Sequence, residues 1–103
     1  MRIFRATVRG QFDGLDEAMA AELRARADEH DILTASFTRE GSFVYSPALT
    51  WLNLRYELRS PDESADAEVE AQALAMAEER LARMGITAKH LRVDLLDMAA
   101  IWD

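Results

Sequence analysis

Residues 51–59 read WLNLRYELR, and this stretch decides the fold. Leucine or tyrosine stands at every second position from Leu52 to Leu58, whereas mostly polar residues stand between them. A period of two places alternate side chains on opposite faces of a strand, so the stretch predicts a strand with one buried and one open face. Residues 60–63 follow directly as SPDE: a serine cap, a proline at the first helical position and a glutamate that completes a capping box.

The helix that starts there is expected to span residues 60–84, with an alternative start nearer Ser64 because so long a helix is unusual in a small domain. Its apolar residues recur at helical spacing and predict an inward stripe of Val69, Ala73, Met76, Ala77, Leu81 and Met84. Arg80 and Arg83 lie near its carboxyl end, as the helix dipole prefers, and the glycine that follows is expected to end it.

Three further stretches have a clear period. Residues 2–9 and residues 89–96 alternate like residues 51–59, and each predicts a strand with one apolar face. After the predicted strand at residues 2–9, residues 15–30 carry an apolar residue at every fourth position, which predicts an amphipathic helix capped by Asp13.

Residues 32–39 also alternate, and residues 43–45 are expected to pair back on them as a short hairpin strand. The order is then strand, helix, hairpin, strand, helix and strand. With right-handed crossovers, this order predicts an α+β fold: a ferredoxin-like split βαβ sandwich, with two helices on one face of an antiparallel sheet that carries an extra hairpin strand. All of residues 1–103 are expected to form this single domain.

The composition excludes several classes of function. The chain carries a formal charge of −7, but residues 62–79 alone hold seven acids and no base, which leaves twelve acids and twelve bases elsewhere. Nucleic acid is therefore not expected as a partner, because phosphate backbones are bound by basic surfaces. No apolar run approaches the length of a membrane span, and the charged start is unlike a signal peptide, so we expect a cytoplasmic protein without membrane contact.

The sequence contains no motif that indicates a metal site or a cofactor. The chain has no cysteine, which removes disulfides, thiolate zinc sites and thiol nucleophiles. Residues 28–31 read DEHD, but adjacent helical residues point in different directions, so no metal site is predicted there. No motif implies a cofactor. Trp102, in an apolar tail, is expected to dock as a plug against the domain, with a lid or a dimer clasp as the alternative.

The open face of the predicted sheet is the candidate site, since it is rich in arginine and carries a tryptophan. We expect Arg5, Arg55 and Arg92 to hold a carboxylate or phenolate, with Trp51 and Asn53 in the lining. His90 or Asp94 is the candidate for proton transfer. In the competing interpretation arginines of this face form cross-strand ion pairs with Glu57 and Asp94, on a wet or dimeric sheet face.

Two functions from different classes fit this pattern. The first is a small homodimeric protein that binds an anionic or aromatic metabolite, and that is an enzyme if His90 or Asp94 transfers a proton. The second is a non-catalytic interaction module that uses the sheet face and the acidic helix, with Glu68, Glu70 and Glu78 as its charged surface. Concavity separates the two, because a ligand pocket needs it and a paired sheet does not.

The chain also resembles a family of small actinobacterial proteins of unknown function. The resemblance rests on residues 2–15, 27–31, 37–41, 55–59, 91–93, 97–98 and 101–103. It implies no activity and no catalytic residue. In architecture, the predicted fold is similar to dimeric α+β barrel proteins, which include cofactor-independent monooxygenases and cyclases of aromatic antibiotic pathways. Fold similarity alone does not establish function.

Overall fold

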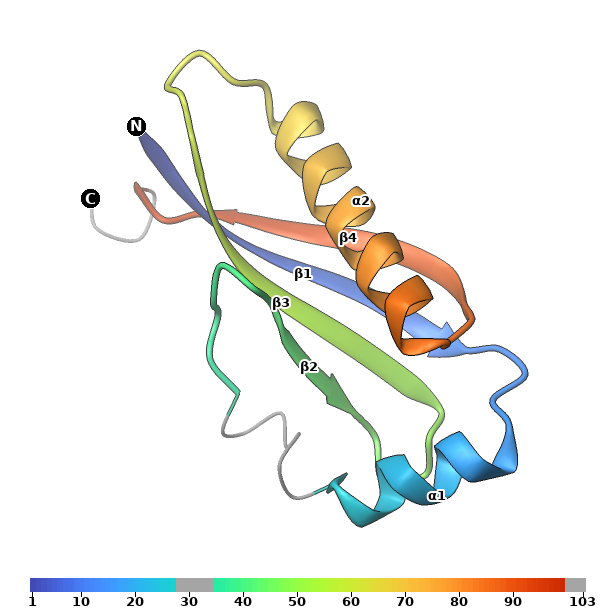
Figure 1. Ribbon diagram of the computed structural model, residues 1–103. Helices are drawn as coiled ribbons and strands as arrows, with labels where there is room; N and C mark the ends of the chain where they lie inside the picture. Colours follow the sequence, from blue (N-terminus) through green and yellow to red (C-terminus); the bar gives the residue numbers. More distant parts are fainter. Residues whose placement is uncertain (28–34, 100–103) are drawn as a thin grey trace.

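The computed structural model describes residues 1–27 and 35–99. Within these ranges the chain forms, in order, β1 (Arg2–Phe12), α1 (Glu17–Ala25), β2 (Ser42–Tyr45), β3 (Trp51–Ser60), α2 (Asp66–Met84) and β4 (Ala88–Asp97) (Figure 1). The strands form one antiparallel sheet in the order β2-β3-β1-β4. The predicted α+β class, with an antiparallel sheet and two helices, is confirmed. Neither described helix is both long enough and apolar enough to cross a membrane.

The core lies between α2 and one face of the sheet. β1 is hydrogen-bonded to β3 on one side and to β4 on the other, and its residues Phe4, Ala6 and Val8 are fully buried. The helix α2 lies across this face (Figure 1). Its predicted inward stripe is confirmed: four members lie in the core and two pack against it, namely Val69, Ala73, Ala77, Leu81, Met76 and Met84.

The start of α2 differs from the prediction. The helix begins at Asp66, and its cap residue, Ala65, makes no side-chain hydrogen bond. Ser60 is instead the last residue of β3, paired with Arg2, and its hydroxyl donates to the Ser64 hydroxyl oxygen at 2.9 Å. The predicted capping box at Ser60 is therefore wrong, because the backbone of that serine is paired within the sheet. The alternative start nearer Ser64 is close to the observed one.

The start of α1 is also displaced. Asp13, the predicted cap, is still tied to the sheet, since its amide donates to the Thr87 carbonyl at 2.9 Å. Gly14 then turns the chain with a φ of 69°. The cap is Asp16, whose carboxylate accepts a hydrogen bond of 2.8 Å from the amide of Met19.

The helix α1 lies toward one end of the sheet (Figure 1), where its Met19 and Leu23 line one cavity together with Met84 of α2. Its Leu23 belongs to the core, and the Leu23 carbonyl accepts a hydrogen bond from the Tyr45 hydroxyl. The helix ends at Ala25. The predicted end, His30, lies outside the described residues.

The hairpin expected from residues 32–39 and 43–45 is wrong. β2 pairs with β3, and the described part of the earlier stretch contributes only an isolated parallel bridge between Thr38 and Tyr56. Residues 32–34 lie outside the described part of the chain. Alternation identifies a segment as strand-like, but it does not specify which edge that segment joins.

Arg2 joins the ends of three elements. From the start of β1, its guanidinium donates to Asp97 on β4 at 2.8 Å and to Asp66 on α2 at 3.1 Å. It also donates to the Ser64 carbonyl at 2.9 Å and lies 4.5 Å from the centroid of the Phe4 ring. The hydrogen bond from Arg2 is the main cause that lowers the pKa of Asp97 below its ordinary value.

We therefore predict that Asp97→Asn lowers the melting temperature at pH 7, with Glu70→Gln as the matched surface control. A carboxyl with a depressed pKa stabilises the fold above its unfolded pKa, and this contribution is lost as pH falls through the folded-state pKa. The difference between Asp97→Asn and the wild type should thus shrink below about pH 4. Thermal unfolding followed by circular dichroism from pH 2.5 to 7 measures it. A difference independent of pH would contradict the role of the charge.

Candidate ligand site on the open face of the sheet

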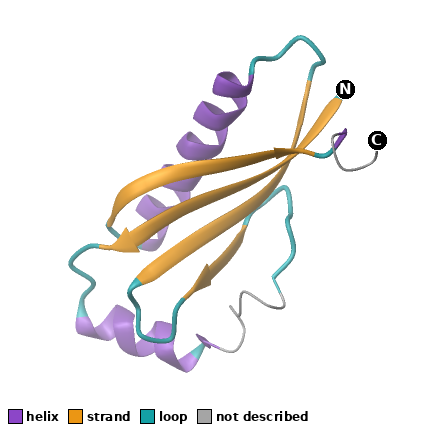
Figure 2. Cartoon of the chain, turned by 180° about the vertical axis from the view of Figure 1, so that it is seen from behind, coloured by secondary structure: helices purple, strands orange, loops and turns teal. Residues whose placement is uncertain are grey.

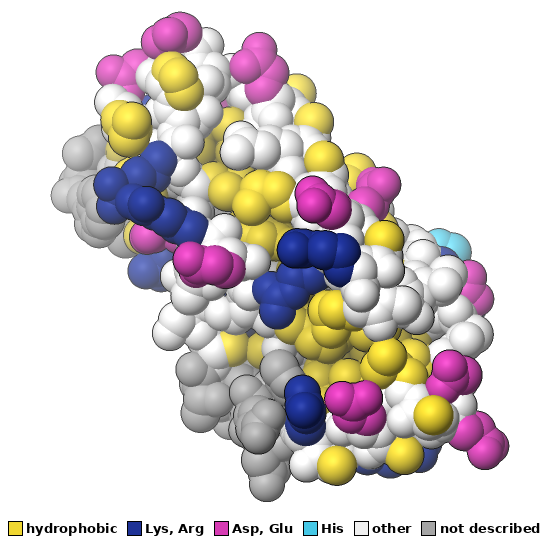
Figure 3. All heavy atoms as spheres, viewed as in Figure 1, with side chains coloured by type: hydrophobic (Ala, Val, Ile, Leu, Met, Phe, Trp, Pro, Cys, Tyr) yellow, Lys and Arg dark blue, Asp and Glu magenta, His cyan; other side chains and the backbone are white. Residues whose placement is uncertain are grey.

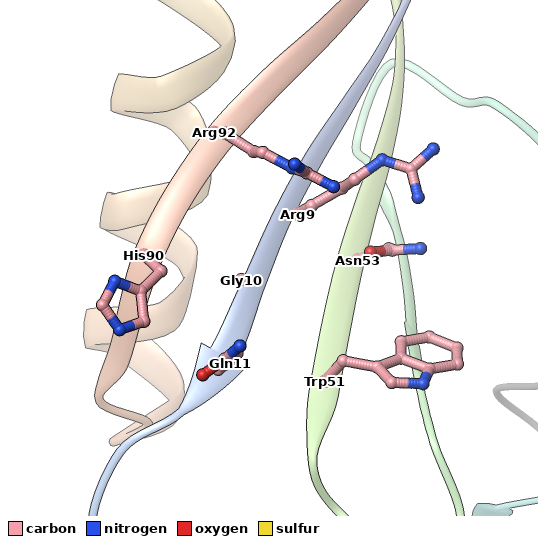
Figure 4. Close-up of a pocket in the computed structure, with 7 residues that line it drawn as sticks. All are labelled: Arg9, Gly10, Gln11, Trp51, Asn53, His90 and Arg92. Carbon is pink, nitrogen blue, oxygen red and sulfur yellow. The ribbon is translucent and has the colours of Figure 1, made fainter.

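The open face is the sheet face turned away from α2 and seen in front of that helix in Figure 2. The strand register places residues from all four strands in one row across it: Val44, Asn53, Arg9 and Arg92. The next row holds Ser42, Arg55, Thr7 and Asp94. The predicted polar alternates of β1 and β3 share this face with Arg92 and Asp94 of β4, whereas His90 does not follow the alternation (Figure 4).

A depression of about 460 Å³ lies on this face toward one end of the sheet. Its lining comes from β1, β3 and β4 (Figure 4): Arg9, Gly10, Gln11, Trp51, Asn53, His90 and Arg92. The volume falls in the range typical of small-molecule sites. Four of the residues singled out in the sequence lie together here: Trp51, Asn53, His90 and Arg92.

A β-bulge shapes this part of the sheet. The pairing of β1 with β4 shifts between Arg9 and Gln11, so that His90 and Leu91 together face the single residue Gly10. His90 takes a left-handed backbone conformation, with a φ of 56°. A Cβ on Gly10 would lie 2.6 Å from Leu91 Cδ2, so the glycine leaves room for the leucine. The bulge therefore sends Leu91 toward the core and redirects the histidine.

The side chains of the depression do not all point the same way. Figure 4 shows Arg9, Arg92, Asn53 and Trp51 projecting to one side of the sheet, whereas the ring of His90 turns away from them at the edge of β4. A ligand over the sheet would thus meet two guanidiniums, an amide and an indole. For His90 to transfer a proton to such a ligand, its ring must rotate. Its catalytic role stays a prediction.

Two of the predicted ligand-binding arginines lie elsewhere on the open face. The guanidinium carbons of Arg5 and Arg55 each lie 5.3 Å from the centroid of the Phe37 ring, a cation–π arrangement. Arg55 also donates to the Ala35 carbonyl at 3.0 Å. These two arginines hold the segment before β2 against the sheet, and neither lines the depression.

Asp94 forms an ion pair with Arg9 across β1 and β4. Both side chains are about half exposed. The cross-strand ion pairs of the competing interpretation are thus present at this position. In the structure the carboxylate orients Arg9, and a proton-transfer role for Asp94 stays a prediction.

The charge of the depression favours an anion. Arg9 and Arg92 are direct cross-strand partners, and Asp94 forms an ion pair with Arg9. Two adjacent guanidiniums repel each other unless an anion lies between or near them. Sequence reasoning placed Arg9 on this face without singling it out. The only sequence mark of the bulge was Gly10, which directly follows the predicted strand at residues 2–9, whereas β1 continues to Phe12.

No metal centre is evident in the described ranges, where no three acidic or histidine side chains converge. The DEHD stretch at residues 28–31 lies outside these ranges. Trp102 lies outside them as well, so its docking stays a prediction.

Comparison with known proteins identifies a family and no relative of known activity. A family described as "Family of unknown function (DUF6204)" matches residues 1–102. Neither the comparison with curated proteins nor that with solved structures finds a match.

The positive φ of His90 at the bulge predicts that glycine is accepted at this position and that a β-branched residue is not. Because β-branched residues are strongly disfavoured at positive φ, His90→Val should lower the free energy of unfolding by about 1–2 kcal/mol. His90→Gly should stay within about 0.5 kcal/mol of the wild type, because glycine accepts this conformation. Lys89→Val, at the neighbouring strand position, is the control and should cost less than His90→Val. Urea unfolding measures all three, and equal costs for the two valine variants would contradict the bulge.

Proposed function

We propose that this chain, which belongs to the DUF6204 family of unknown function, binds a small anionic ligand with an aromatic or planar body in the depression on the open face. The observation that carries the proposal is the pair Arg9 and Arg92 beside Trp51 in one depression of ligand size. Guanidiniums bind carboxylates, phenolates and phosphates through paired, charge-assisted hydrogen bonds.

Each side chain has a distinct part in the proposal. The two arginines supply the charge, and Asp94 holds one of them in position through its ion pair with Arg9. Asn53, which is 4% exposed, offers an amide fixed by its burial. Trp51 is half-buried and presents an indole on which a planar ligand can stack.

A second copy of the chain forms part of the proposal. The depression is open on the side away from the sheet, and the same face carries Leu96, which is 44% exposed. A homodimer through the open faces would cover that leucine and exclude water from the ligand.

The strand order β2-β3-β1-β4, with a helix after β1 and after β3, supports a variant of the ferredoxin-like arrangement. With His90 turned inward, such a cytoplasmic dimer would suit cofactor-independent chemistry, for example on an aromatic intermediate of secondary metabolism.

A second candidate function is an interaction module. It is supported by the exposed acids along α2, Glu68, Glu70 and Glu78, which face solvent with no base among residues 62–79. Such a surface would bind a basic partner in a salt-dependent way. The concave depression favours the ligand-binding function over this one.

Ligand binding is tested with aromatic carboxylates such as benzoate, salicylate and naphthoate. In a Trp102→Phe background, Trp51 is the sole tryptophan, so its fluorescence reports the depression directly. We expect saturable quenching by at least one probe. Arg9→Ala and Arg92→Ala should each weaken it about tenfold or more, because each removes charge-assisted hydrogen bonds.

Arg59→Ala is the matched control, since this exposed arginine lies near the far end of β3 and outside the depression. Its affinity should equal that of the Trp102→Phe parent. Native mass spectrometry with and without the probe should give a mass near twice 11.6 kDa. Absence of quenching by every probe, or equal affinities in all three arginine variants, would contradict the proposed site. A monomeric mass together with saturable probe binding would contradict only the dimer and not the ligand site.

A further inference from the structure

A second cavity, of about 510 Å³, lies on the other side of the sheet, between α2 and the turn before β2. It is lined by Arg39, Glu40, Gly41, Tyr56, Met76, Glu79, Arg80 and Arg83. In Figure 3, which views this side, basic side chains lie beside hydrophobic atoms near the middle of the surface. The cavity shares no lining residue with the depression on the open face.

Tyr56 is the unusual member of this lining. The residue is 1% exposed, and its hydroxyl is buried without a hydrogen-bond partner in the described part of the chain. Its ring lies directly on Gly41, where a Cβ would come within 2.3 Å of Cε1 and where φ is 89°. A buried hydroxyl with no partner destabilises a fold, whereas phenylalanine would fill the same space without that penalty. The phenol therefore points to a partner outside the described part of the chain.

Three arginines line the same cavity as Tyr56, namely Arg39, Arg80 and Arg83. Met76, Glu79, Arg80 and Arg83 recur at spacings of three and four along α2, so they share one face of the helix. The Arg80 guanidinium donates to the carbonyls of Glu40, at 3.1 Å, and Gly41, which fixes the turn against the helix. The turn brings Arg39 to the same cavity.

The charges facing the cavity are three arginines against two glutamates, Glu40 and Glu79. The balance is positive, although the chain as a whole carries −7. Arg39 and Arg83 are exposed and form no ion pair within the described residues. Both are therefore available to a ligand that enters from solvent.

We propose that this cavity binds a phosphate group, with the Tyr56 hydroxyl as a hydrogen-bond donor and Arg39 and Arg83 as its charged partners. Because the hydroxyl is shielded, binding requires a neighbour to move. Arg80 is placed to exchange the two turn carbonyls for phosphate oxygens. The cavity is larger than one phosphate ion, so a phosphate monoester fits it as well as free phosphate.

The test uses inorganic phosphate and, in a second arm, phenyl phosphate and glycerol 3-phosphate. Titration calorimetry at constant ionic strength separates binding from the general stabilisation that phosphate salts produce. We expect saturable binding to the wild type, tighter for at least one monoester if the ligand is a phosphorylated metabolite. Tyr56→Phe should weaken it about tenfold, while its stability without phosphate equals or exceeds that of the wild type.

Tyr45→Phe is the matched control, because this second tyrosine donates its hydroxyl to the Leu23 carbonyl. It should lose stability and bind phosphate like the wild type. Arg83→Gln should weaken binding, whereas Arg24→Gln, on α1, should not. Equal phosphate affinity in the wild type and Tyr56→Phe, or no saturable binding at all, would overturn the proposal. Arg92→Ala, which tests the open-face site, should leave phosphate binding intact, so the two proposals fail separately.

Discussion

The central position of β1 is the constraint on which the rest of the structure depends. The strand is hydrogen-bonded along both edges, so neither of its neighbours can shift without breaking a ladder. One of its faces, with Phe4, Ala6 and Val8, is sealed against α2, and a slip of one residue would turn arginines into the core. The same alternation necessarily delivers Arg5 and Arg9 to the open face. Alternation therefore explains why these arginines lie on the open face. Function has to be inferred from how the side chains of that face are arranged.

That arrangement comes from a single irregularity. Opposite Gly10, β4 carries one residue more than β1, and the extra residue changes which side chains of β4 face the sheet surface on either side of it. Without the bulge, His90 and Arg92 would stay on the same face in an even ladder, as simple alternation implies. With it, Arg92 remains beside Arg9 while the ring of His90 turns away. The bulge therefore separates a binding role, which needs the arginines, from a proton-transfer role, which needs the histidine.

Much of this fold could be predicted from the sequence, because alternation and helical spacing are direct consequences of burial. β3, β4 and the inward stripe of α2 follow from that pattern alone. The helix starts could not be predicted from cap residues, since Ser60 and Asp13 are good caps whose backbones the sheet already uses. The face of the candidate residues other than His90 was predictable, but their neighbours were not: Arg55 binds the segment before β2, while Arg92 reaches the depression. Contacts of that kind depend on strand register and on loop conformation. Neither of these leaves a periodic pattern of apolar residues in the sequence.

The two candidate sites differ in what their residues would do without a ligand. On the open face, arginines exposed to water lose little when no anion is bound, because solvent satisfies them, so their presence alone is weak evidence. Tyr56 is different, since water does not reach its hydroxyl and no described group accepts its proton. Burial also raises the pKa of this phenol, so it stays protonated at neutral pH and can donate a hydrogen bond to an anion. A buried donor in a cavity that three arginines line fits an oxyanion, and this makes the cavity beside α2 the more discriminating of the two sites.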